Sequence, residues 1–117
     1  MLTRLLPVRS PGLQPGAIKD TVPAPGVLAR LAQGNPRPFF MVGSDPFSLR
    51  WLVTNAKTLR EVSAVGLLVQ ADTKEDIRRV AGAARGLSIT LGSGSDLARA
   101  LGIRRYPVLI TRDGFMQ

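Results

Sequence analysis

Proline is unevenly distributed in this chain, and its distribution divides the 117 residues into two parts. Proline occurs nine times, and all but two of these residues fall within the first 38 positions, at 7, 11, 15, 23, 25, 36 and 38. Because proline fixes φ and lacks a backbone N–H, such a segment cannot form a continuous helix or a central strand. We therefore predict an extended, proline-rich arm over residues 1–38 and a folded domain over residues 39–117. The arm lies across this domain or wraps a neighbour.

From Phe39 onward, apolar runs typical of buried strands alternate with segments of helical periodicity. The runs at 39–43 and 64–69 are separated by a helix that begins at Asp45 and Pro46, so the connection is a crossover and the two strands are parallel. A second helix begins at a capping box of Asp72 and Glu75. Further elements are expected at 87–91 (strand), 95–101 (short helix), 107–111 (strand) and beyond a turn at 113–114. This order predicts a three-layer α/β domain, βαβαβαβ.

The chain contains neither cysteine nor histidine. This composition removes thiol redox chemistry, imidazole base catalysis and the usual transition-metal ligands. Serines at 44, 93 and 95 therefore lack a histidine partner. The eight carboxylates form no ligand pattern in the sequence. We predict a protein that is not an enzyme and that has neither a cofactor nor a metal site.

Sixteen Lys and Arg residues against eight Asp and Glu leave a net charge of +8. The cations are spread along the chain without a consecutive basic block, and six aromatic residues are few for base stacking. One interpretation is a solvated, mildly basic surface. The alternative is a DNA-contacting accessory protein, in which Arg78 and Arg79 on one helix and Arg104 and Arg105 near the last strand bind phosphates.

The segment before the last long strand resembles the cis-proline segment of thioredoxin-like folds. Gly102, Ile103, Arg104 and Pro107 fall in the register Gly-Ile-Arg-x-x-Pro. The element order is also similar to that of TrbC-type conjugal transfer proteins, which implies a thioredoxin-like domain. In redox thioredoxins a Cys-x-x-Cys occupies the place held here by residues 44–47, and serine cannot replace a thiolate that cycles through a disulfide.

Several phrases further resemble a family of integrating conjugative element proteins of unassigned biochemical role. They lie at residues 6–10, 42–46, 48–52, 64–69, 93–98 and 106–111. The resemblance implies a part in conjugative DNA transfer through a type IV secretion apparatus, with other transfer or secretion-channel proteins as partners. Members carry an export signal that is not seen at Met1, so we expect a mature, periplasmic domain. No apolar run approaches the roughly 20 residues of a membrane span.

The candidate site follows from this resemblance. A proline at the mouth of such a fold leaves the backbone groups before it free to pair with an extended chain. We predict that a groove formed by Ser44, Asp45, Phe47, Tyr106 and Pro107 binds a segment of a partner. Two simpler interpretations remain: Asp45 caps its own helix, and Pro107 only fixes the strand entry while Tyr106 packs on Trp51 or Phe47. A homo-oligomer is also possible.

Overall fold

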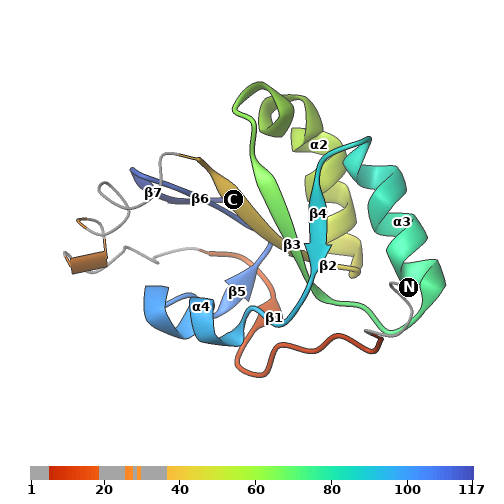
Figure 1. The fold of residues 1–117 in the computed structure, drawn as a ribbon, viewed down its shortest axis with the longest axis horizontal. Coiled ribbons are helices and arrows are strands. Elements are labelled where there is room, and N and C mark those ends of the chain that lie inside the picture. The colour runs from red at the N-terminus through yellow and green to blue at the C-terminus, as the bar shows by residue number, and fades with distance from the viewer. Residues whose placement is uncertain (1–5, 19–25, 28, 30–36) are drawn as a thin grey trace.

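A mixed β-sheet forms the centre of the fold (Figure 1). The structure is a computed structural model that describes residues 6–18, 26–27, 29 and 37–117. Within these residues the sheet has five strands in the order β4-β3-β2-β6-β7. Strands β2, β3 and β4 are parallel, whereas β6 runs antiparallel to β2, and β7 antiparallel to β6. The strands are β2 (Phe39–Gly43), β3 (Val65–Gln70), β4 (Ile89–Leu91), β6 (Val108–Thr111) and β7 (Gly114–Met116).

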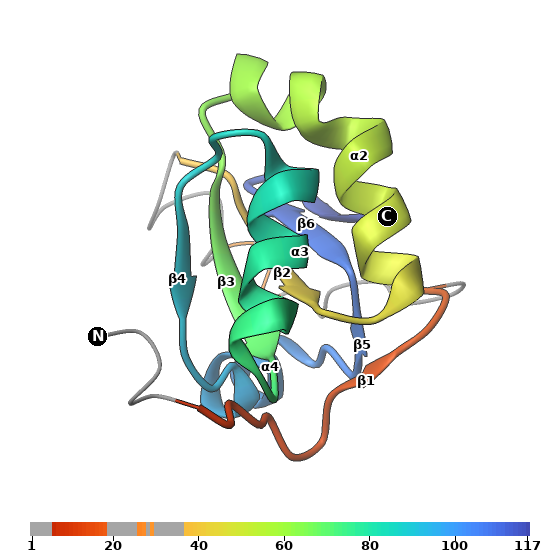
Figure 2. The same cartoon turned by 90° about the vertical axis from the view of Figure 1, so that its right-hand side faces the viewer.

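Helices cover both faces of this sheet (Figures 1 and 2). In the described part of the chain, the helices are α2 (Pro46–Glu61), α3 (Lys74–Ala84) and α4 (Ser95–Leu101). Helices α2 and α3 lie side by side on one face, and α4 lies on the other (Figure 2). The α/β class predicted from the sequence is therefore confirmed.

The central strand β2 explains how the two faces arise. Successive side chains of a strand point to opposite sides. Phe40 and Val42 accordingly pack with α2 and α3, whereas Met41 packs with α4. All three side chains have no exposed surface. The unbroken apolar run at 39–43 is thus required by burial on both faces.

Side chains cap the first turns of α2 and α3. Asp45 caps α2 as the sequence predicts, with Pro46 in the first turn. At α3 the predicted capping box is displaced by one residue, because Thr73 is the N-cap and its hydroxyl accepts a hydrogen bond from the Asp76 N–H. The Asp76 carboxylate in turn accepts from the Thr73 N–H. Helix α3 ends at Ala84, and its C-cap residue Arg85 has a left-handed φ of 50°.

The proline-rich segment includes an ordered stretch, residues 6–18, that packs on the sheet. Val8 forms an isolated bridge with Ala71, and Val8 and Leu13 are both buried. Strand β1 (Gln14–Pro15) pairs in parallel with the two-residue strand β5 (Arg105–Tyr106). Figure 1 shows this segment, in red and orange, running beside α4 towards β5. The remainder of the predicted arm, residues 1–5, 19–25, 28 and 30–36, lies outside the described residues.

Candidate functional site

The start of α2 is closed by its own hydrogen bonds. The two Asp45 carboxylate oxygens accept from the Ser48 N–H at 3.0 Å and from the Ser48 hydroxyl at 2.7 Å. The same hydroxyl accepts from the Gly43 N–H at 3.0 Å, and Ser48 is completely buried. The positive end of α2 therefore already holds a carboxylate, which is the capping interpretation of Asp45.

Ser44 connects this turn to the end of β3. Its backbone N–H and its hydroxyl both donate to Oε1 of Gln70, at 3.3 and 2.8 Å. Gln70 is the last residue of β3 and the only polar residue of that strand. Gln70 is not among the site residues predicted from the sequence. A glutamine at the end of an apolar strand nevertheless indicates a polar contact at the sheet edge.

Tyr106 lies against the same turn. A Cβ atom placed on Gly43 would be 2.4 Å from Tyr106 Cε1 and 2.8 Å from Asp45 Oδ1, so glycine is required for this close approach. Tyr106 packs in the cluster on the α4 face, with Leu13 and Met41 among its members. Trp51 belongs instead to the cluster on the face of α2 and α3, where its ring neighbour is Phe40.

The backbone around Pro107 is already paired. The Tyr106–Pro107 bond is cis. The Gly16 N–H donates to the Tyr106 carbonyl at 3.0 Å, and the Gln14 N–H donates to the Arg104 carbonyl at 3.1 Å. The carbonyl of Pro107 accepts from Nε2 of Gln117 at 2.9 Å. The chain's own residues 14–16 thus occupy the edge at which the sequence predicts a partner segment.

Phe47 lines a separate hollow of about 500 Å³ in which none of the other four predicted residues takes part. The structure thus brings Asp45 and Tyr106 together, with Ser44 next to them, and buries Pro107. A second hollow, of about 290 Å³, lies between the arm and the sheet; Tyr106 and Gln70 line it together with Ser10 and Leu13.

Comparison with known proteins gives one match. The model of a family described as protein of unknown function, DUF2859, matches residues 1–115. The chain belongs to this family. No curated protein and no solved structure is detectably similar.

Membership in DUF2859 assigns no chemistry, so function must be argued from the site itself. In the described part of this DUF2859 chain, no group of three or more His, Cys, Asp or Glu side chains is placed to hold a metal ion. No helix among those residues is long and apolar enough to cross a membrane.

The arginines of the nucleic-acid alternative fall into two groups on different elements. On α3, Arg78 pairs with Glu75 and Arg79 with Asp76. Near β5, Arg105 donates to Oε1 of Gln14.

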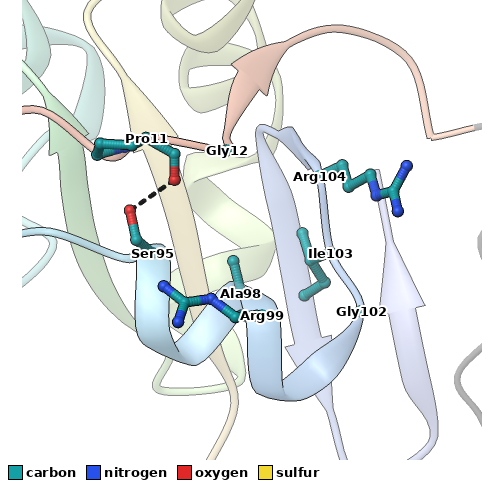
Figure 3. Close-up of a pocket in the computed structure, with 8 residues that line it drawn as sticks. All are labelled: Pro11, Gly12, Ser95, Ala98, Arg99, Gly102, Ile103 and Arg104. Atoms are coloured by element: carbon teal, nitrogen blue, oxygen red, sulfur yellow. Dashed lines mark hydrogen bonds between the residues drawn. The ribbon is translucent and has the colours of Figure 1, made fainter.

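Arg104 lines a hollow of about 240 Å³ between the arm and α4. Figure 3 shows the guanidinium groups of Arg99 and Arg104 pointing away from each other at opposite sides of this hollow. The two cations therefore do not form a joint phosphate clamp.

Burial and the nearby Asp45 charge raise the pKa of Tyr106 to about 12. Since Tyr106 is the only tyrosine, tyrosinate absorbance reports on it alone. We expect the folded protein to ionise this phenol well above the ordinary value of 10. The folded state holds the proton more tightly, so its stability should be complete below pH 10 and decline as the pH rises towards about 12.

Tyr106→Phe is the matched control, because it should remove the alkaline decline specific to the phenol. Unfolding free energies of both proteins, measured across that range, give the comparison. A folded protein whose tyrosine ionises near 10 would contradict the described burial.

Proposed function

We propose that this chain is a non-enzymatic binding component of a conjugative transfer apparatus, acting on other transfer or secretion-channel proteins in the periplasm. The support for the apparatus and the compartment is the resemblance to integrating conjugative element proteins. The support for a binding role is geometric and comes from the edge next to Pro107.

We interpret the fold as thioredoxin-like. Three features support this interpretation: β2, α2 and β3 in sequence, β6 and β7 antiparallel beside β2, and a proline that opens β6 next to the start of α2. Strand β4 and helix α4 are then additions between α3 and the proline segment. Residues 44–47, which take the place of the redox pair, supply a helix cap instead of thiols.

The observation that carries the binding proposal is the pairing of β1 with β5. An extended segment that adds to a strand forms hydrogen bonds to backbone groups facing outward from that strand. In residues 14–16, two backbone N–H groups donate such hydrogen bonds to the carbonyls of Arg104 and Tyr106. The edge is therefore built to accept an extended chain, and in this structure it accepts its own arm. A partner strand would take the same carbonyls when the arm leaves.

Replacing Gly16 with proline should release the arm. The substitution removes the N–H that donates to the Tyr106 carbonyl, and proline cannot adopt the φ of 158° found at this position. The arm and the partner compete for the same edge. If arm docking is weakened by roughly 1.4 kcal/mol, we expect about tenfold more partner capture. The measurement is in-cell crosslinking from a photoreactive residue at position 104 in donor cells, with mass spectrometry of the products.

The matched comparison uses Val53→Ala, an exposed change on α2 that should leave capture unaltered. Tyr106→Ala is expected to lower both capture and the frequency of element transfer in a donor strain that carries no other copy. Two results would overturn the proposal: adducts with nucleic acid only, or capture and transfer that are unaltered in Gly16→Pro and Tyr106→Ala alike.

A further inference from the structure

Strand β4 is an edge of the sheet. It pairs with β3 on one side, and no strand among the described residues pairs with its other side (Figure 2). The Ser88 carbonyl accepts from the Gly66 N–H and the Gly92 N–H donates to the Leu68 carbonyl, at 2.8 and 3.2 Å. Because backbone groups of a strand alternate in direction, those of Ile89 and Leu91 face outward.

An apolar hollow of about 190 Å³ runs beside this edge, under α3. Ile89 and Leu91 of β4 line it together with Ile77 and Ala81 of α3. Thr90 is exposed and takes no part, as the alternation of a strand requires. The hollow is smaller than the roughly 300–1,000 Å³ typical of small-molecule sites, so it fits one apolar side chain.

Three exposed cations lie on α3 or directly after it. In the helical repeat of α3, Lys74 and Arg78 lie next to Ala81, on the side away from the buried Ala83. Arg85 is the C-cap residue directly after the helix. Arg78 is paired with Glu75, which leaves Lys74 at one end of the helix and Arg85 at the other.

The spacing of these cations matches an extended chain. Lys74 begins α3 and Arg85 directly follows its last residue, so their Cα atoms are about 16 Å apart along the helix axis. In a strand, side chains on one face that are four residues apart are separated by about 13 Å. A segment laid along β4 with an apolar side chain in the hollow therefore brings the side chains two residues before and after it towards Lys74 and Arg85.

We propose that the outer edge of β4 accepts an extended acidic segment of a partner protein, with an apolar side chain in the hollow and a carboxylate on either side. Charge selects this occupant over a second copy of the chain, because two copies would each bring a net charge of +8. This edge is distinct from the β5 edge, and the proposal holds whether or not the conjugative assignment does.

The test is a nuclear magnetic resonance titration of the full chain with a capped peptide of sequence glutamate, threonine, leucine, threonine, glutamate. In an extended peptide the two threonines face the side opposite to the leucine and the glutamates. We expect the backbone amide signals of Ile89 and Leu91 to shift, and the shifts to weaken with added salt. The same peptide with lysine in place of glutamate should not bind.

Variants locate the site. Ala81→Phe fills the hollow from an exposed helix position and should weaken peptide binding at least tenfold, whereas Ala100→Phe on α4 should not. Lys74→Glu should weaken it threefold to tenfold, whereas Lys57→Glu on α2, with the same change in net charge, should leave it unaltered. Both substituted alanines and both lysines are exposed, so the fold is expected to persist.

Four outcomes would overturn the proposal. They are equal binding of the lysine peptide, unchanged binding by Ala81→Phe, peptide-induced shifts confined to β1 and β5, and shifts of Ile89 and Leu91 that follow protein concentration without peptide. The last would identify a second copy as the occupant. Failure here leaves the crosslinking result at the β5 edge unaffected, so the two proposals are separately testable.

Discussion

Replacing Phe40 with alanine is expected to lower the free energy of unfolding by about 3–5 kcal/mol. Phe40 is fully buried in the central strand, and its ring centroid is 6.0 Å from that of Trp51. On its other side a Cβ atom at Gly66 would be 2.4 Å from the Phe40 ring, which therefore lies directly over the glycine. Truncation leaves a cavity that neither the sheet backbone nor Gly66 can fill.

Urea unfolding followed by tryptophan fluorescence measures this loss, because Trp51 is the only tryptophan and it contacts the substituted ring. Val53→Ala, on the exposed side of α2, should change the stability by less than about 0.5 kcal/mol. A loss below about 1 kcal/mol for Phe40→Ala would show that the two-faced core described for β2 is wrong.

Replacing Ser10 with alanine should destabilise the docked arm by about 2–3 kcal/mol. The buried Ser10 hydroxyl donates to the Val69 carbonyl at 2.8 Å and accepts from the Gly94 N–H at 2.9 Å. Alanine leaves both backbone groups without this partner. Arm opening should then be about 30- to 150-fold more frequent, since each 1.4 kcal/mol is a factor of ten.

Amide hydrogen exchange at Gln14 and Gly16 measures the opening directly, because both N–H groups bond to the β5 segment. Ser93→Ala is the matched control: that hydroxyl is exposed and accepts only a 3.3 Å hydrogen bond from the Ser95 N–H. Unchanged exchange at both amides in Ser10→Ala would mean that the serine does not hold the arm.

Much of the fold was predictable because its signals are local. The run at 39–43 is apolar because both faces of β2 are covered, and the pair Asp45–Pro46 marks a helix start by its own capping chemistry. The displaced start of α3 shows the limit of such reasoning. The sequence offers two overlapping capping boxes, Asp72 with Glu75 and Thr73 with Asp76, and the structure contains the second.

Pairing between distant segments was not predictable. Nothing in Gln14–Pro15 has the alternation of a strand, and its pairing depends on backbone groups at Arg104–Tyr106. In the candidate site, too, only the features set by neighbouring residues were predictable. Capping by Asp45 follows from local residue types, whereas the approach of Tyr106 to Gly43 and the contact of Ser44 with Gln70 are set by how the sheet brings three loops together.

The two paired strands β1 and β5 are synthesised at different times. Gln14 and Arg105 are separated by 91 positions, so the arm is made long before the strand to which it binds. At about 5–20 residues per second, synthesis leaves roughly 5–20 s in which the arm has no edge to occupy. In a nascent chain, the N–H groups of Gln14 and Gly16 therefore have no β5 partner until residues 104–106 have been made. If the proposed partner strand is present at that moment, it would meet the β5 edge before the arm is docked there and would not have to displace it.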